Sequence, residues 1–456
     1  MNEKFLSLRK QFQTFIYHDY HIKEEENQIV LQFDFEIVGL AQFHPTIAIK
    51  KKDIPFQKVD NDFVKNLVFH IGMVELVSYW KCACPPNVIV KCGYLNDEQI
   101  KWFQKLYYNG LGEYRYINQI QMTQEEMMKI TIEAPYQKIE KLSKEELKGA
   151  LIPIGGGKDS TVTLELLKQT KEDNYCLMIG GKEPSIQSAK IAGYTDNQII
   201  EVTRTIDSEL LQLNKQGYLN GHTPFSSLLA FLSYFIAFLT GRKYVALSNE
   251  SSAEESNVEG EKINHQYSKS YEFEQDFVYY SNQYLKAGVQ YFSLLRPLNE
   301  LQIAKLFSKN TQYHAIFKSC NVGSKSIPWK WCGECPKCLF VFIILSPFLY
   351  KEELTKIFGQ DLYEKENLQE TFKQLCGHGE TKPFECVGTY EEVNYALTNT
   401  IQKLEKQGEK LPYLLQFYKD NQYTVDITED ITKRYNEKNN VPKELNAIVK
   451  EMMRTL

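Results

Sequence analysis

Ala150-Leu-Ile-Pro-Ile-Gly-Gly-Gly-Lys-Asp-Ser-Thr161 joins a short apolar run to three glycines and then to a polar Lys-Asp-Ser group. Apolar residues at helical spacing follow from Val162, so the pattern predicts a strand, a loop and a helix. Adjacent glycines let the backbone approach a ligand closely, and the N–H groups of a helix N-terminus favour a phosphate. We expect Asp159 or Ser160 to cap this helix. The alternative is a glycine-rich turn that binds nothing.

The stretch differs from the common phosphate loop, in which Ser or Thr follows Gly-Lys and its hydroxyl reaches Mg²⁺. It resembles instead the PP-loop of N-type ATP pyrophosphatases, Ser-Gly-Gly-x-Asp-Ser, although Gly155 replaces the first Ser and one hydroxyl contact is lost. The resemblance implies that ATP is cleaved between its α- and β-phosphates. It also implies that the nucleotide lies against Gly155, Gly156, Gly157, Lys158, Asp159 and Ser160.

Strand and helix patterns alternate after this loop. The runs 175–179, 198–203 and 243–248 have the length of strands, and Phe225–Leu239 has the length of a buried helix. The alternation predicts an α/β fold, with a parallel sheet and helices on both faces, as in the PP-loop ATP pyrophosphatase or HUP-like architecture. Pro153 is awkward inside a central strand, so we expect a missing neighbour or a bulge there.

The length of 456 residues indicates more than one domain. We place an N-terminal α+β domain at residues 1–148, because 29–37 alternates as a half-buried strand does and 63–81 has helical spacing. A PP-loop domain with a cysteine-rich site follows at 149–345. The last part, 346–456, is a helical and charged C-terminal region.

The composition limits the classes of protein. Hydrophobic residues at 43% and charged residues at 24% allow a large core and exclude global disorder. A net charge of −5 gives no overall electrostatic reason to bind nucleic acid. We expect no membrane span and no signal peptide. Ten cysteines without a secretion signal indicate a reducing cytoplasm.

Two polar segments are candidates for chemistry. Asn249 and Glu250 directly follow the run 243–248, and ligands of such sheets bind beyond the carboxyl ends of the strands. A carboxylate there can hold Mg²⁺ against phosphates, whereas the alternative is an acidic loop residue in solvent. The run 264–274 offers His265, Tyr267 and Lys269, which suit an anionic substrate and proton transfer. Its alternative is a polar surface loop. His222 is a second candidate for proton transfer.

Four cysteines form the other chemical signal, since two overlapping CxxC units follow an upstream thiol. Four thiolates suit a structural Zn²⁺ site, with an iron–sulfur cluster or free thiols as the alternatives. The residues concerned are Cys320, Cys332, Cys335 and Cys338.

Several motifs together are similar to those of the MurL family, the UDP-N-acetyl-α-D-muramoyl-L-alanyl-L-glutamate epimerases of bacterial peptidoglycan synthesis. The resemblance covers about residues 40 to 350 and is carried by GMVEL at 72–76, SYWK at 78–81, GLGE at 110–113, GGGKDS at 155–160, SNESSA at 248–253, NHQYSKS at 264–270, LLRPL at 294–298 and WCGECPKC at 331–338.

The resemblance implies that ATP converts the glutamate carboxylate of a UDP-MurNAc-dipeptide to an acyl-adenylate, with AMP and pyrophosphate as products. The activated carbonyl then makes the α-proton easier to remove, and its return from the other face gives D-Glu. Asp159 and Glu250 are candidates for Mg²⁺. His265, Tyr267 and Lys269 are candidates for substrate contact or proton transfer, and the sequence does not assign the base.

Two other functions remain open at this point. PP-loop enzymes that adenylate a nucleobase or transfer RNA, of the queuosine-precursor synthase or thiolase type, also pair such a loop with a cysteine-rich zinc site. A non-catalytic adenine-nucleotide sensor is the second alternative, because the loop lacks its Ser. The sequence gives no oligomeric state.

Overall fold

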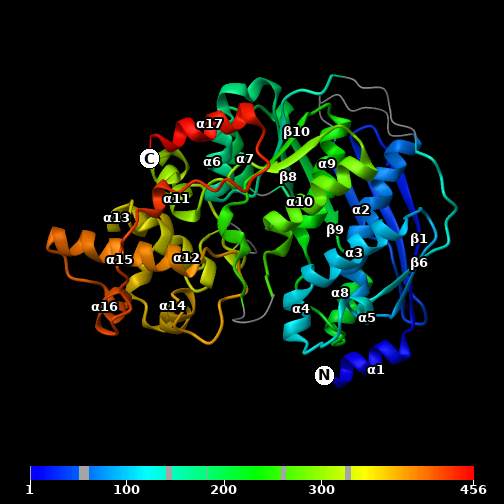
Figure 1. Cartoon of the computed structure of the whole chain (residues 1–456), viewed down its shortest axis with the longest axis horizontal. Coiled ribbons are helices and arrows are strands. Elements are labelled where there is room, and N and C mark those ends of the chain that lie inside the picture. The colour runs from blue at the N-terminus through cyan, green and yellow to red at the C-terminus, as the bar shows by residue number, and fades with distance from the viewer. Residues whose placement is uncertain are drawn as a thin grey trace.

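The computed structural model describes residues 2–50, 61–139, 146–181, 183–257, 263–323 and 330–455. Its centre is one mixed, mostly parallel sheet with helices on both sides (Figure 1). Along the sheet the described strands are ordered β11-β10-β7-β8-β9-β4-β2-β1-β5-β6, and β3 pairs with β2. The strands are β1 Thr14–Glu24, β2 Gln28–Ile37, β3 Ala41–Phe43, β4 Thr46–Lys50, β5 Asn87–Val90, β6 Lys129–Ile132, β7 Ala150–Pro153, β8 Tyr175–Ile179, β9 Ile199–Thr205, β10 Tyr244–Leu247 and β11 Gln290–Ser293.

The helices cover the two faces of this sheet and build the C-terminal part (Figure 1). They are α1 Glu3–Gln11, α2 Asp62–Trp80, α3 Asp97–Gly110, α4 Gly112–Ile117, α5 Gln124–Met127, α6 Lys158–Leu166, α7 Glu183–Ile191, α8 Ser208–Lys215, α9 Phe225–Leu239, α10 Tyr271–Tyr280, α11 Glu300–Lys309, α12 Pro336–Leu345, α13 Lys351–Phe358, α14 Gln369–Leu375, α15 Tyr390–Gln407, α16 Tyr413–Asp420 and α17 Lys443–Met453.

The predicted α/β fold is confirmed in the strands β7 to β11, which are all parallel. Strand β7 lies between β8, which follows it through α6, and β10, which follows much later in the chain. The order of strands therefore changes direction at β7, and such a switch point leaves a crevice beyond the carboxyl ends of its strands. The glycine loop follows β7 and lies at this point.

Pro153 shows how β7 accommodates a residue without an N–H group. The ladder between β7 and β10 ends at Leu151, whereas the ladder with β8 continues to Pro153 opposite Leu177. The neighbour on the β10 side is thus absent at Pro153, which is one of the two expected arrangements. Directly before the glycines, the N–H group of Ile154 still donates to the carbonyl of Leu177 at 2.8 Å, so the loop stays anchored on the β8 side.

Strands of the expected N-terminal domain belong to the same sheet as the glycine-loop strands. β4 pairs with β9 in antiparallel orientation, from Thr46 opposite Thr205 to Ile49 opposite Val202. The sheet is mixed rather than purely parallel because β2 and β4 run against their neighbours. The expected boundary at 148/149 stays a prediction, and strands on its two sides share backbone hydrogen bonds.

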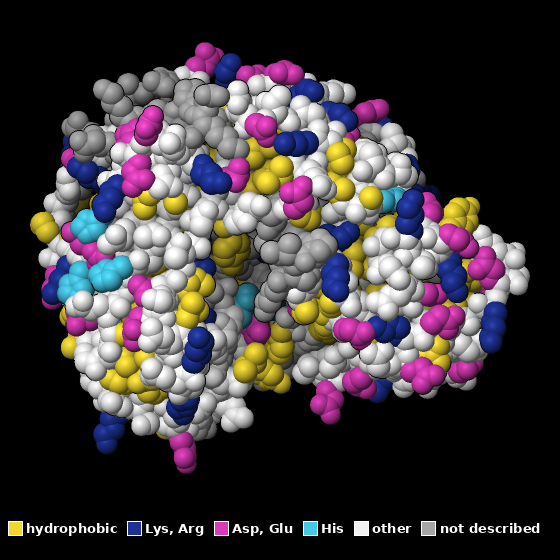
Figure 2. Space-filling model, turned by 180° about the vertical axis from the view of Figure 1, so that it is seen from behind, with side chains coloured by type: hydrophobic (Ala, Val, Ile, Leu, Met, Phe, Trp, Pro, Cys, Tyr) yellow, Lys and Arg dark blue, Asp and Glu magenta, His cyan; other side chains and the backbone are white. Residues whose placement is uncertain are grey.

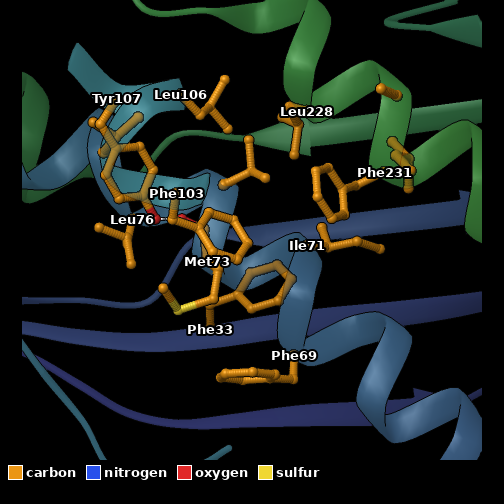
Figure 3. Close-up of a cluster of buried hydrophobic side chains, with 14 of the residues drawn as sticks. Phe33, Phe69, Ile71, Met73, Leu76, Phe103, Leu106, Tyr107, Leu228 and Phe231 are labelled. Atoms are coloured by element: carbon orange, nitrogen blue, oxygen red, sulfur yellow. Dashed lines mark hydrogen bonds between the residues drawn. The ribbon is translucent and has the colours of Figure 1, made fainter. Parts of the chain in front are cut away.

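The sheet separates two apolar cores. Leu151, Leu177 and Val245 face a core shared with α2, α3 and α9, while Ile152 faces a core shared with α6, α11, α12 and α15. Figure 3 shows α2 in the first core, where Phe103 and Phe231 approach it from α3 and α9. The hydroxyl of Tyr107 donates to the carbonyl of Met73 at 2.5 Å, so this polar group is satisfied inside the core.

The region after residue 345 is helical, as predicted, and its apolar side chains continue the second core through α15 and α16. α9 is buried along most of its length, which agrees with the buried helix expected there. Among the described residues, none of the helices combines the length and the apolar character that crossing a membrane requires.

Candidate active site

The glycine loop ends at the N-terminus of α6. The N-cap residue is Gly157, and no described side chain caps the helix. The expectation that Asp159 or Ser160 caps it is wrong, because both lie inside the first turn and the Ser160 hydroxyl donates to the carbonyl of Gly157 at 3.1 Å. The first N–H groups of α6 therefore keep their capacity to bind an anion.

The three glycines have different surroundings. Gly155 is exposed, and no described atom lies within 4 Å of the place where a Cβ would stand. Gly156 has φ +79°, and a Cβ there would lie 2.9 Å from the Cβ of Pro184 and from the backbone nitrogen of Ser185. Gly156 thus fixes the turn against α7, while Gly155 presents bare backbone outward. Such a cradle fits a phosphate group.

Lys158 begins α6 and is buried at the centre of a group of carboxylates. Its ammonium contacts Asp159 and Glu300, the first residue of α11. Burial lowers the pKa of Lys158, but these two carboxylates outweigh it and the pKa is raised. Burial raises the pKa of Glu300 to about 7. The negative charges of Asp159 and Glu250 add to this rise, whereas the positive charge of Lys158 opposes it. A further cation would relieve this carboxylate cluster.

Asn249 and Glu250 follow β10, as expected for the adjacent strand end. The Asn249 amide donates to the hydroxyl of Ser293 at 3.1 Å. Glu250 is buried rather than in solvent, and burial together with Asp159 raises its pKa. The buried carboxylate of Glu250 and the half-buried carboxylate of Asp159 supply the oxygen ligands that Mg²⁺ prefers.

Arg296 holds two parts of the site together. Its guanidinium is fully buried and donates at 2.5 Å to the carbonyls of Glu250 and Lys269. It also pairs with Glu274 at 3.1 Å. These bonds fix the backbone of the segment after β10 relative to the segment 264–270, which explains why an arginine stands in the motif LLRPL.

His265 is paired with Glu113, which lies on α4. Its Nδ1 contacts the Glu113 carboxylate, and His222 Nδ1 lies 3.7 Å from the same carboxylate. The acceptor and ring nitrogen atoms of these three side chains lie within 4.8 Å of one another. Burial lowers the pKa of His265, but hydrogen bonds to Cys386 and Glu113 outweigh it and raise the pKa to about 9. Burial and the nearby His265 charge lower the pKa of His222 to about 3.

Lys269 donates to the sulfur of Cys386 at 2.9 Å. Lys337, between the two cysteines of the CPKC segment, donates to the carbonyl of Cys386. Burial raises the pKa of the Cys386 thiol, but the charge of Lys269, a hydrogen bond from His265 and the charge of Lys337 lower it to about 5. The neighbouring Lys269, His265 and Lys337 therefore favour the anionic form of this sulfur.

Tyr267 lies apart from this sulfur. It is buried, its hydroxyl is hydrogen-bonded to Asn109 of α3, and burial raises its pKa. The structure therefore brings His265 and Lys269 together through Cys386 and directs Tyr267 toward α3. The proposed role of each of these residues stays a prediction.

The four sulfurs of the cysteine-rich segment converge in one place. Cys320 and Cys335 are 3.7 Å apart, Cys332 and Cys338 are 3.6 Å apart, and Cys335 and Cys338 are 3.5 Å apart. A tetrahedral Zn²⁺ with Zn–S bonds near 2.3 Å requires sulfur separations of roughly 3.8 Å. The donor set and its spacing fit a structural zinc ion.

Sequence patterns did not reveal Glu300, Lys337 and Cys386 as members of the site. Cys386 is 117 positions from Lys269, and no spacing rule connects it with 264–270.

Figure 2 shows a hollow between the two lobes of the molecule, with histidine and acidic side chains visible inside it. GLGE at 110–113 was a usable signal, because its last residue is the partner of His265.

Fold and site define an α/β protein with a glycine-rich anion cradle at the switch point of its sheet and a neighbouring acid–base cluster. The chain belongs to the MurL family. The family's N-terminal domain model matches residues 7–294, and its C-terminal domain model matches residues 316–426.

Three relatives carry the name UDP-N-acetyl-alpha-D-muramoyl-L-alanyl-L-glutamate epimerase. The protein of Xanthomonas oryzae pv. oryzae is 35% identical over 364 residues, 78% of each chain. The protein of a Micromonospora species is 33% identical over 72% of this chain and 73% of its own. The protein of Salinispora tropica is 33% identical over 72% of this chain and 71% of its own. The protein is accordingly an isomerase of the epimerase type.

Proposed function

We propose that this protein inverts the terminal L-Glu of UDP-MurNAc-L-Ala-L-Glu to D-Glu during peptidoglycan precursor synthesis. The reaction uses ATP, activates the glutamate as an acyl-adenylate and releases AMP and pyrophosphate. The observation that carries this proposal is the adjacency of two groups. Asp159, directly after the glycine loop, and Lys269 of the segment 264–270 are close enough for the charge of each to shift the pKa of the other, and Lys269 contacts the sulfur beside His265.

The glycine loop would hold the nucleotide. Backbone N–H groups of Gly155 to Ser160 would bind phosphate oxygens, and Asp159 with Glu250 would hold Mg²⁺. ATP supplies, when bound, an AMP group that cancels the charge of the glutamate carboxylate and makes its carbonyl electron-withdrawing. Since the carboxylate itself is a poor electron sink, this activation is what makes removal of the α-proton feasible.

The protein's own groups would handle the proton and the developing charge. Lys269 and Lys337 place positive charge beside the site, which favours an anionic substrate and an anionic transition state. His265 keeps its proton at neutral pH because Glu113 and the sulfur of Cys386 stabilise the imidazolium. It is therefore a proton donor under these conditions, not an acceptor.

Membership in the MurL family favours the epimerase over the enzymes that adenylate a nucleobase or transfer RNA. The sensor alternative rested on the missing loop hydroxyl. The open backbone at Gly155 and the uncapped start of α6 can bind a phosphate without that hydroxyl. The missing hydroxyl therefore no longer favours a sensor over an enzyme.

Incubation with ATP, Mg²⁺ and UDP-MurNAc-L-Ala-L-Glu in D₂O tests the proposal. We expect AMP, pyrophosphate and D-Glu that carries deuterium at Cα, measured by nucleotide chromatography and chiral mass spectrometry. Asp159→Ala should stop AMP formation. AMP with glutamate that remains wholly L and unlabelled would refute the epimerase reaction and favour an ATP-dependent ligase.

A further inference from the structure

Cys386 lies in a setting that no sequence motif indicates. Its sulfur accepts from Lys269 at 2.9 Å, is hydrogen-bonded to His265, and lies next to the charge of Lys337. His265 is in turn oriented by Glu113. A thiol beside an imidazole that a carboxylate orients is the arrangement by which proteins keep a sulfur ionised and correctly placed.

The three groups expected from the sequence all hold their protons at neutral pH. Hydrogen bonds raise the pKa of His265 to about 9, although burial opposes the rise. Burial lowers the pKa of Lys269, but Cys386 and Glu250 outweigh it and raise the pKa. Burial raises the pKa of Tyr267. Each of them can donate a proton and is a poor acceptor at neutral pH, which makes the sulfur of Cys386 a better candidate for the base than these three groups.

We propose that Cys386 is the catalytic base that removes the α-proton of the activated glutamate. This inference rests on the proposed function. Lys269 contacts the sulfur directly, and its positive charge also acts on the carboxyl groups of Asp159 and Glu250, the candidates for holding Mg²⁺.

The step balances without any additional reactant. The Cα–H bond breaks, an S–H bond forms on Cys386, and the electron pair moves onto the activated carbonyl oxygen. The charges of Lys269 and Lys337 favour that oxygen anion. Water donates a proton to the opposite face of Cα, which gives the D-isomer and restores the carbonyl, and the Cys386 thiol then returns its proton to the hydroxide so formed, which regenerates the sulfur anion.

Cys386→Ser and Cys386→Ala test the assignment in the full-length protein. Both should keep AMP formation in a single turnover with ATP, Mg²⁺ and UDP-MurNAc-L-Ala-L-Glu, because activation precedes proton transfer. Deuterium incorporation at Cα in D₂O should fall by about 10²–10⁴-fold, the usual contribution of a general base. Cys92→Ser is the matched control, since Cys92 is also half-buried but lies beside Tyr20 of β1.

The outcomes separate the two proposals. Wild-type protein that forms AMP without labelled D-Glu would refute the epimerase function and this assignment together. Labelled D-Glu from wild type and from Cys386→Ser at equal rates would overturn the assignment alone. Equal loss of AMP formation and deuterium incorporation in both Cys386 variants would indicate a structural role and would likewise overturn it.

Thiol reactivity gives a measurement that does not depend on turnover. Alkylation by iodoacetamide, followed residue by residue with mass spectrometry, should modify Cys386 at pH 6 with a pH midpoint near 5, because the sulfur is already ionised there. Cys92, whose pKa is raised by burial and by Asp19, should stay unmodified at this pH. A midpoint for Cys386 near that of an ordinary thiol would overturn the inference.

Discussion

At the scale of the residue, two histidines show how strongly neighbours decide protonation. The rings of His222 and His265 lie 4.3 Å apart. Burial, together with the charge of His265, lowers the pKa of His222 to about 3, whereas Cys386 and Glu113 raise that of His265 to about 9 against burial. One imidazole is neutral and the other charged at pH 7, and such divergence is a feature of acid–base sites.

Glu113→Gln should destabilise the protein in a pH-dependent manner. Because the folded-state pKa of His265 lies above its ordinary value of 6.5, the stabilisation by Glu113 is complete below pH 6.5 and disappears as the pH rises through 9. Denaturant unfolding of both proteins should give a difference of at most about 3 kcal/mol at pH 6. The hydrogen bond between His265 and Cys386 is present in both proteins and does not contribute to the difference. A difference in unfolding free energy that stays constant from pH 6 to 10 would therefore contradict the pairing of Glu113 with a protonated His265.

The first two glycines of the loop should respond differently to alanine. Gly156→Ala forces a Cβ into a left-handed turn against Pro184 and Ser185, and we expect a loss of about 1 kcal/mol or more in unfolding free energy. Gly155→Ala meets open space and should leave the melting temperature unchanged. If the backbone at Gly155 contacts phosphate, the KM for ATP should rise in Gly155→Ala nonetheless. Equal melting temperatures for the two variants would contradict this reasoning.

At the scale of the element, the hydrophobic pattern predicted strands and helices well where an apolar run had the length typical of one of them. The run 175–179 became β8 with the same bounds, and 225–239 became α9 with the same bounds. β1 escaped prediction because its second half is largely exposed and interrupted by charged residues. Cys386 escaped because it lies between α14 and α15 and meets Lys269 only after folding. Local patterns contain no information about such distant contacts.

α12 connects the cysteine cluster with the candidate active site. Cys335 is its N-cap and Cys338 lies in its first turn, while Lys337 between them reaches the backbone of Cys386. A metal ion held by the four thiols would therefore fix the position of Lys337 as well as the fold of the segment. The four-cysteine cluster would thus also determine where the positive charge of Lys337 lies relative to Cys386.

The purified protein should contain one Zn²⁺ per chain, measured by elemental analysis without added metal. Cys335→Ser should remove it and lower the melting temperature, because metal binding contributes directly to folding. Cys176→Ser provides a matched control, since Cys176 is a buried cysteine of β8 outside the cluster. A metal-free and fully stable wild-type protein would refute the zinc site and return these residues to the role of free thiols.

At the scale of the whole molecule, one sheet unites segments that the sequence assigned to separate domains. β9 belongs to the glycine-loop half and pairs with β4 of the N-terminal half. An ion pair with a buried carboxylate also joins the two halves, since Arg204 of β9 donates to both oxygens of Glu75 on α2 at 2.8–3.0 Å. The side chain of Glu75 is only 1% exposed, so this carboxylate depends on Arg204 for its partner.

Arg204→Met should therefore destabilise the whole molecule and not one half of it. Removing the guanidinium leaves the Glu75 carboxylate buried without a partner, which costs about 3–5 kcal/mol. The double variant Glu75→Leu/Arg204→Met replaces both charges with apolar groups and should recover most of that loss. Arg434→Met removes an exposed arginine paired with Glu429 and Glu391, and as a control it should change stability by at most about 1 kcal/mol. Since β4 and β9 share hydrogen bonds, hydrogen exchange monitored by mass spectrometry should show faster exchange in both strands of Arg204→Met. Faster exchange confined to residues before 149, or a double variant no more stable than the single one, would contradict coupling of the two halves through this pair.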